Sequence, residues 1–364
     1  MSLTLAESLA ARQNNFDLIR FVAATMVIFA HAYVLTHGND EQELLHQITQ
    51  HQMTFGTLGV AIFFVISGFL ISQSYERSAN IWIYIKARIL RIFPALIVVL
   101  LLTVFLFGPV MTQLSFMEYF TSSKTYRYLT GIFLFPVHYH LPGVFENNPY
   151  PKAVNGSLWT ISYEMLCYVM VAFLGVLGLM RWRGLLLVIL LGLFVFRLFW
   201  FEELFVLEKK WNFWFRGIGF SQLIELVNYF LAGTVIYLYR EKVILHHYLA
   251  LLAMIILGVA SVMGGLEAWF IIAGSYLIIY IAFTPYIRCH HFAHYGDFSY
   301  GLYIYAFPVQ QTLVYLSGAT WHPLLNAFVS LPVVLFFAVL SWHLIEHSAL
   351  QLKNVVLISP RLKI

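Results

Sequence analysis

The sequence predicts an all-α fold, a polytopic membrane helix bundle of about ten transmembrane helices with both termini cytoplasmic. Hydrophobic residues make up 61% of the 364 positions and charged residues only 10%, whereas soluble domains carry about 25% charged residues. Ten stretches approach the roughly 20 apolar residues that a bilayer-crossing helix needs. Lys and Arg gather in alternate connections between these stretches, which is the pattern of cytoplasmic loops.

The predicted spans account for most of the chain. They are residues 17–36, 56–74, 89–109, 157–179, 184–201, 222–239, 246–264, 267–284, 298–317 and 324–345. Because the sequence shows no internal repeat, low-complexity tract or separable soluble domain, we expect one domain over 1–364, with a core at about 15–346 and a cytoplasmic tail at 347–364. The first apolar stretch lacks a clear small-residue cleavage site, which favours a retained span over a signal peptide.

The orientation is predicted from the positive charges. With a cytoplasmic N-terminus, fourteen Lys and Arg residues fall on the cytoplasmic side and six on the opposite side, although the opposite side has the longest loops. Two external segments, 110–156 and 202–221, are rich in aromatic residues, Pro and Asn. Each is interpreted either as a sugar-facing surface or as an interfacial lid that packs on the bundle.

Charge and cysteine content argue against two other classes of protein. The net charge of +4 is small and sorted by side of the membrane, so no nucleic-acid partner is expected. Cys167 and Cys289 are the only cysteines, and they predict no disulfide framework.

Two short motifs resemble metal sites but do not predict one. Segment 343–347 matches the H-x-x-E-H pattern of inverted zinc peptidases. Zinc catalysis needs a third protein ligand and an open position, and no distant ligand is evident. Segment 289–294 holds one Cys and three His but lacks paired spacing. We therefore expect no metal.

Arg20 and His31 are the sharpest pair of ionisable residues within a predicted span. Eleven residues at 100° each bring the two side chains to one helix face, about 16 Å apart along the axis. A guanidinium near the cytoplasmic mouth can hold a phosphate-bearing donor, and a neutral imidazole further in can remove a hydroxyl proton. Alternatively, Arg20 is a positive-inside anchor and His31 a core group with satisfied hydrogen bonds.

Two further sites carry charge at the predicted span ends. Arg88 and Arg91, spaced i, i+3, can clamp phosphates from one helix face or can be ordinary topology charges. Glu164 lies at the external entrance of the fourth span and needs a partner. That partner is either a histidine, which the carboxylate would orient or charge, or a packing contact with Arg197 or a Tyr hydroxyl.

Several stretches taken together resemble the acyltransferase-3 family of membrane O-acyltransferases, which includes enzymes that acetylate O-antigen, exopolysaccharide and nodulation-factor sugars. The matching stretches are Asp17 to His31, which keeps the family's Arg-x10-His pattern, Gly59 to Ile71, Arg88 to Pro94, Ser157 to Glu164, and Asp297 to Tyr303. Their order and spacing cover nearly the whole chain. Two positions depart from the family pattern, Ala306 in place of His and His347-Ser348 in place of Arg-Pro, which puts a catalytic role for Glu346 in doubt.

The resemblance implies transfer from a cytoplasmic acyl-CoA, usually acetyl-CoA, to a lipid-linked or polymeric carbohydrate in a bacterial plasma membrane. Acyl-CoA would be a donor substrate, with no cofactor bound permanently. The resemblance implies His31 as a catalytic residue, Arg20, Arg88 and Arg91 as donor-site or core-motif residues, and Glu164 in an acidic position of the family. We expect Arg20 and Glu164 to act with His31 in catalysis, and Arg20, Ser67, Arg88 and Arg91 to bind the donor.

Other functions remain open from the sequence alone. Intramembrane Arg, His and Glu also build the relays of transporters and flippases, although inverted repeats and paired broken spans are not detectable. A non-catalytic scaffold is a third interpretation. For an acyltransferase, the sequence does not choose between direct transfer and a covalent acyl-histidine relay.

Overall fold

The computed structural model describes residues 3–11, 13–211, 214–215 and 218–354, and it confirms the all-α helix bundle. Every one of the ten predicted spans coincides with a helical segment. The eighth, 267–284, matches the helical stretch Leu266–Phe283, which ends in α15 (Ser275–Phe283). The helices of the other spans are α2 (Phe16–His37), α4 (Phe55–Arg77), α5 (Ile81–Leu102), α9 (Trp159–Val176), α10 (Arg183–Phe199), α12 (Phe220–Leu238), α13 (His247–Met263), α16 (Ser299–Leu316) and α17 (Pro323–Ser341).

Seven helical segments among the described residues are long and apolar enough to cross a membrane. An eighth span arises if α10 and α11 (Phe201–Trp211), which are bent by 73°, are one span. The other two predicted spans are helical but different in character. Helix α13 has 17 residues, and α16 carries Gln310 and Gln311, both fully buried. Because protein surrounds α16, its glutamines hydrogen-bond to backbone carbonyls instead of facing lipid.

The remaining elements are short and lie mostly in the connections. They are α1 (Leu5–Ala10), α3 (Leu44–Ile48), α6 (Gly108–Met111), α7 (Phe116–Thr121), α8 (Ser123–Arg127), α14 (Leu266–Trp269) and α18 (His347–Gln351), with the antiparallel pairs β1 (Leu3–Thr4) with β4 (Ile244–Leu245) and β2 (Trp214–Phe215) with β3 (Ile218–Gly219). The expected tail at 347–364 begins with α18, which continues the last span, and residues 355–364 lie outside the described part.

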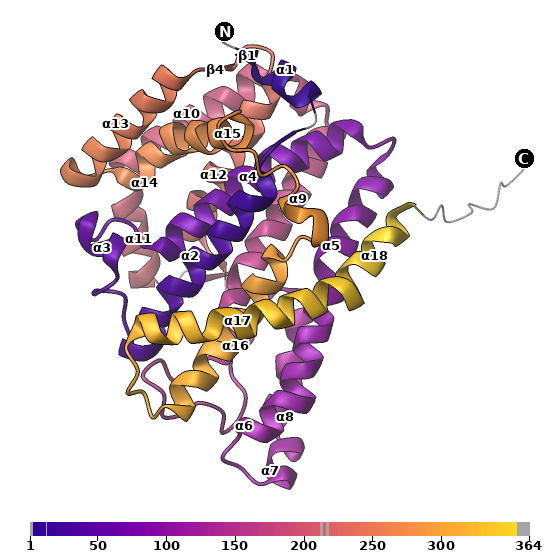
Figure 1. Cartoon of the computed structure of the whole chain (residues 1–364), viewed down its shortest axis with the longest axis vertical. Coiled ribbons are helices and arrows are strands. Elements are labelled where there is room, and N and C mark those ends of the chain that lie inside the picture. The colour runs from indigo at the N-terminus through magenta and orange to yellow at the C-terminus, as the bar shows by residue number, and fades with distance from the viewer. Residues whose placement is uncertain (1–2, 12, 212–213, 216–217, 355–364) are drawn as a thin grey trace, which may run out of the picture.

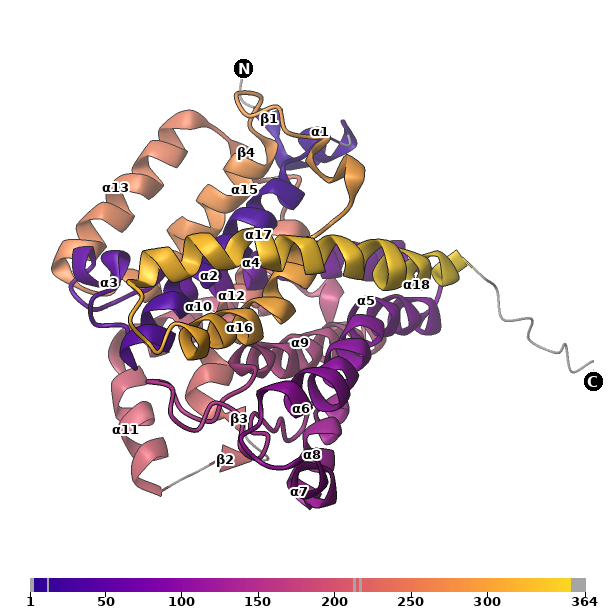
Figure 2. The ribbon, with the colours of Figure 1, turned by 60° about the horizontal axis from the view of Figure 1, so that its bottom comes forward.

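Helix α2, which carries Arg20 and His31, lies inside the bundle. It packs against α4, α16 and α17, and α17 crosses in front of α2 and α16 in both ribbon views (Figures 1 and 2). In the same views α3 and α11 lie on the side opposite α18. The cavities described below are arranged between the α18 end of the bundle and the end that contains α3 and α11.

Two glycines allow α4 and α12 to pack with their backbones in close contact. A Cβ at Gly68 would clash with the carbonyl oxygen of Phe230, and one at Gly233 would clash with that of Val65. The Ser72 Oγ donates a hydrogen bond to Thr234 Oγ1 at 3.1 Å across the same interface. Small residues and hydroxyl contacts of this kind drive helix association in membranes.

Segment 110–156, which is predicted to be external, packs in part on the bundle. Asn148 Nδ2 donates to the side chain of Gln311 at 2.7 Å, and Asn155 Nδ2 donates to the carbonyl of Ile304 at 2.8 Å. Both acceptors lie on α16. These contacts agree with the packing interpretation for this part of the segment, while its role as a sugar-facing surface stays a prediction.

We expect Gly233→Val to destabilise the protein, because the added side chain must push apart the backbones of α4 and α12. Overpacking of this kind costs about 1–3 kcal/mol or more. Thermal unfolding of the purified protein in detergent measures the effect. Gly192→Ala is the matched control, since a Cβ at Gly192 in α10 meets only open space. Equal melting temperatures for both variants would contradict the close packing of α4 on α12.

The predicted orientation can be tested by labelling single cysteines in a variant without the two native ones. Positions 45, 140 and 210 should react with a membrane-impermeant reagent from outside. Positions 80 and 182 and both termini should react only after the membrane is opened. External labelling at position 182 would contradict the ten-span arrangement, because that loop carries Arg181 and Arg183.

Candidate active site

An inner cavity of about 330 Å³ brings together five of the six residues that the sequence predicts for the site. Arg20 comes from α2, Ser67 from α4, Arg88 and Arg91 from α5, and Glu164 from α9. Leu350 and Lys353, in the segment expected to be a tail, also line this cavity. The cavity therefore lies at the α18 end of the bundle, which is cytoplasmic in the predicted orientation.

Two of these arginines form ion pairs with Asp297, a residue for which the sequence predicted no role. Arg20 Nη1 and Arg91 Nη2 each donate to Asp297 Oδ2 at 2.7 Å. Arg91 Nη1 also lies 3.5 Å from Glu346 Oε2, and Ser341 Oγ donates to Glu346 Oε1 at 2.8 Å. The network joins α2, α5, the start of α16 and the end of the last span.

Asp297 is ionised in this network. Burial acts to raise the pKa of its carboxyl, but the guanidiniums of Arg20 and Arg91 lower it more, with help from Ser299. Ser299 donates to Asp297 Oδ1 through its hydroxyl at 2.6 Å and its backbone N–H at 3.2 Å. The resulting pKa lies well below the usual range, so the carboxylate balances positive charge at the cavity wall.

Arg88 differs from Arg91 although the sequence presents them as a pair. Its guanidinium lies over the ring of Tyr168, 5.7 Å from the centroid, just as that of Arg91 lies over the ring of Tyr300 at 5.6 Å. Its Nε is buried without a hydrogen-bond partner, and within the described part of the chain no carboxylate forms an ion pair with it. Arg88 is thus the arginine of this cavity that keeps donors available for an anionic ligand.

Glu164 has the tyrosine partner that was one of its predicted alternatives. Its Oε1 accepts a hydrogen bond from the Tyr168 hydroxyl and another from Ser67 Oγ at 3.4 Å. Arg197 forms an ion pair with Glu267 instead. His31 and Glu164 line different cavities, so the structure does not bring these two predicted catalytic residues together.

His31 lines a second cavity of about 190 Å³. Its ring meets the ring of Phe307 edge to face at 5.2 Å between centroids, and its Nδ1 is buried without a hydrogen-bond partner. Asp40, Thr54 and Thr57 contribute to the same wall from the predicted external side. The inner cavity and the His31 cavity share the lining residues Val60 and Tyr303.

A third, outer cavity of about 710 Å³ continues the series. It shares Glu225 with the His31 cavity and is lined by segments near α3, α11 and α14. His51 and Gln52 contribute from the loop between α2 and α4. Three cavities therefore follow one another from the α18 end to the α3 and α11 end of the bundle.

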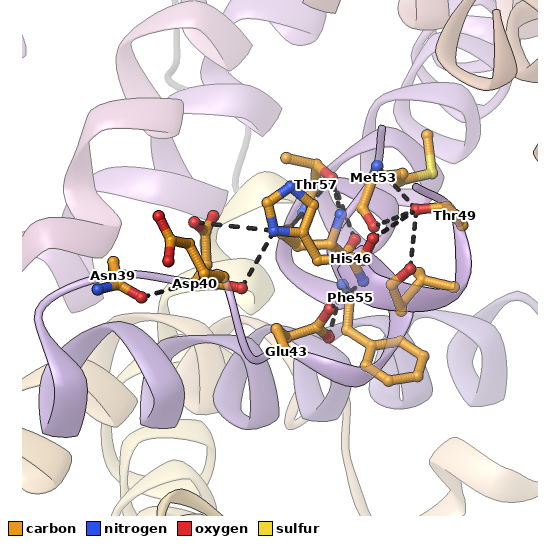
Figure 3. A network of polar contacts seen from close by, with 11 residues as sticks. Asn39, Asp40, Glu43, His46, Thr49, Met53, Phe55 and Thr57 are labelled. Atoms are coloured by element: carbon orange, nitrogen blue, oxygen red, sulfur yellow. Dashed lines mark hydrogen bonds and ion pairs between the residues drawn. The ribbon is translucent and has the colours of Figure 1, made fainter. Parts of the chain in front are cut away.

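The loop between α2 and α4, residues 38–54, is held by a buried glutamate (Figure 3). Glu43 Oε2 accepts from the backbone N–H of His46 at 2.7 Å, and Glu43 Oε1 accepts from that of Phe55 at 3.1 Å. The Thr49 hydroxyl closes the turn before α4 through the backbone of Met53. These contacts position the loop residues that line the two outer cavities.

Sequence reasoning missed Asp297 although a signal for it existed. Two arginines placed at a predicted membrane boundary need carboxylates, and Asp297 lies at the start of a predicted span on the same side. Glu346, whose catalytic role was doubtful, supports Arg91 instead. Among the described residues, no group of three or more His, Cys, Asp or Glu side chains could hold a metal.

Comparisons with known proteins show the family to which the chain belongs. Residues 13–343 match the acyltransferase-3 family model, described as an acyltransferase domain. The chain is 30% identical over 338 residues to a protein named O-acetyl transferase from Shigella phage Sf6, covering 92% of this chain and 95% of the relative. It is 27% identical over 384 aligned positions to Nodulation protein 10 of Rhizobium leguminosarum bv. viciae, covering 98% of both. No solved structure matches the chain. The chain belongs to the acyltransferase-3 family and is a multi-pass membrane acyltransferase.

Proposed function

We propose that the protein moves an acetyl group from cytoplasmic acetyl-CoA to a hydroxyl of a lipid-linked or polymeric cell-surface glycan in a bacterial plasma membrane. The observation that carries this proposal is the meeting of two cavities at Val60 and Tyr303, one containing the free guanidinium of Arg88 and the other the imidazole of His31. The relative named O-acetyl transferase supports the acyl group and the oxygen acceptor.

The inner cavity suits the donor. Arg88 offers charge-assisted hydrogen bonds to phosphate oxygens, and Lys353 adds a second cation at the same wall. Apolar side chains from α4, including Phe63 and Phe64, line the deeper part. The phosphates of the donor therefore sit at the cytoplasmic mouth, and the uncharged pantetheine arm extends toward the wall shared with the His31 cavity.

The outer two cavities suit the acceptor. Both are lined by external-loop residues, and Glu225 connects them. Carboxylates and amides such as Glu225 and Gln222 can bind sugar hydroxyls, and Trp159 offers an aromatic face. A glycan approaching from outside reaches His31 without entering the donor cavity.

The chemical step is acyl transfer with His31 as general base. His31 removes the proton of the acceptor hydroxyl, and the oxygen attacks the thioester carbonyl. The carbon–sulfur bond then breaks, and the imidazolium returns the proton to the leaving thiolate. General-base help contributes about 10²–10⁴ in rate, and positioning of the two substrates contributes much of the rest. Because the family is one of acyltransferases, the transporter alternative is not retained.

The function is tested with membrane vesicles from bacteria that express the chain. Radiolabelled acetyl-CoA is supplied at the cytoplasmic face, and label in the glycan fraction is measured before and after mild alkali. O-acetyl esters release acetate under these conditions, whereas amides do not. Incorporation no greater than that of vesicles without the protein would overturn the proposal.

We predict that His31→Ala and His31→Gln each reduce acetyl transfer by about two orders of magnitude or more. Glutamine can imitate one hydrogen bond of the ring but cannot accept the proton. Expression, thermal stability and acetyl-CoA binding should be retained. His37→Gln on the same helix is the matched control, because His37 lies outside the cavities described here. Near-normal turnover of His31→Gln would make His31 a structural residue.

The two arginines of α5 should differ in their effects. Arg88→Ala should weaken acetyl-CoA binding by about ten- to a hundredfold, which corresponds to the roughly 1.5–3 kcal/mol of hydrogen bonds to charged groups. Binding of acetyl-pantetheine, which lacks the CoA phosphates, should not change. Arg91→Ala should instead lower the melting temperature, because it leaves Asp297 and Glu346 with fewer partners. If Arg88→Ala and the wild type bind acetyl-CoA equally well, Arg88 does not bind the donor and is an ordinary topology charge.

A further inference from the structure

Tyr303 occupies the wall between the two proposed substrate cavities. It lies on α16, it is buried, and it lines both the inner cavity and the His31 cavity. Val60 from α4 is the other lining residue that the two cavities share. A valine side chain offers no hydrogen bond, so the hydroxyl of Tyr303 is the polar side-chain group in this shared wall.

The hydroxyl of Tyr303 is directed by a second hydroxyl. Thr160, in the first turn of α9, lines the inner cavity, and its Oγ1 lies 2.6 Å from Tyr303 Oη. The ring of Tyr303 meets that of Phe63 edge to face at 6.0 Å between centroids, which further limits its orientation. The tyrosine hydroxyl therefore lies beside a residue of the inner cavity.

The reaction requires the thioester carbonyl at this same place. The sulfur belongs to a donor in the inner cavity, whereas the attacking oxygen is held at His31 in the next cavity. The carbonyl carbon must be within bonding reach of both, and this places it between the two cavities. Attack then puts negative charge on the carbonyl oxygen in a site where burial makes hydrogen bonds to charge strong.

We infer that Tyr303 is a catalytic residue that donates a hydrogen bond to the thioester oxygen and stabilises the oxyanion formed on attack. Thr160 is a positioning residue: it donates its proton to Tyr303 Oη, so that the tyrosine proton is free to point at the substrate. A tyrosine hydroxyl can accept one hydrogen bond while donating another.

The electrons and protons balance with these roles. The acceptor oxygen forms the new carbon–oxygen bond as its proton moves to His31, and the carbonyl π electrons move to the oxygen beside Tyr303. When the tetrahedral intermediate collapses, the carbonyl re-forms, the carbon–sulfur bond breaks, and the thiolate takes the proton from His31. Tyr303 keeps its own proton throughout. The inference rests on the proposed function, because it needs the donor and acceptor in their respective cavities.

The test compares Tyr303→Phe with wild type in the vesicle assay, together with acetyl-CoA binding to the purified full-length protein. We expect kcat to fall about a hundredfold or more, the typical effect of losing one oxyanion donor, while acetyl-CoA affinity is unchanged. Thr160→Val should lower kcat by about five- to tenfold, the scale of one ordinary hydrogen bond. Tyr305→Phe is the matched control, since Tyr305 is buried on the same helix but lines none of the three cavities.

A second donor separates catalysis from packing. Fluorine in fluoroacetyl-CoA withdraws charge from the developing oxyanion, so transfer from this donor should depend less on Tyr303. The loss in Tyr303→Phe should therefore be several-fold smaller with fluoroacetyl-CoA than with acetyl-CoA. An equal loss with both donors, or a loss confined to donor affinity, would overturn the inference. Full activity of Tyr303→Phe would also overturn it while leaving the proposed function intact, whereas no transfer by the wild-type protein would overturn both.

Discussion

The ion pairs of Asp297 with Arg20 and Arg91 are the constraint on which the arrangement of the inner cavity depends. One carboxylate oxygen accepts from two guanidiniums, and these come from helices far apart in the sequence. Buried charges are tolerated only when they are paired and hydrogen-bonded, and removing one partner typically costs about 3–5 kcal/mol. Asp297 therefore fixes α2 and α5 against the start of α16, and Glu346 ties the last span to the same point.

This constraint determines which cations remain for a ligand. Because Arg20 and Arg91 form ion pairs with Asp297, they shape the inner cavity but leave fewer N–H donors for a ligand. Arg88, one helical turn from Arg91, stacks on Tyr168 and retains an unpaired buried Nε. Both arginines lie over a tyrosine ring, but among the described residues only Arg91 has carboxylate partners, so two residues that look equivalent in the sequence have different chemistry.

The sequence predicted the helices well because hydropathy and length are local properties. Each predicted span coincides with a helical segment, but the 73° bend between α10 and α11 depends on packing and was not predicted. The same distinction holds at the site. A tyrosine hydroxyl was one of the predicted partners of Glu164, and Tyr168 is only four residues away from it in the chain. Asp297, which was not predicted, lies 277 residues from Arg20 and 206 from Arg91. Helix periodicity relates Arg20 to His31 but carries no information on which distant carboxylate meets either of them.

The division into separate cavities has a chemical consequence under the proposed mechanism. A thioester open to water on both sides of a membrane would be lost to hydrolysis, and a polar glycan cannot enter the apolar part of the bundle cheaply. A wall to which Val60 and Tyr303 both contribute addresses both difficulties. Only the reacting carbonyl and hydroxyl need to meet there, so neither substrate crosses the membrane. Such a wall must be thin, and it must carry a polar group where the oxyanion forms. The hydrogen-bonded hydroxyls of Tyr303 and Thr160 supply that polar group.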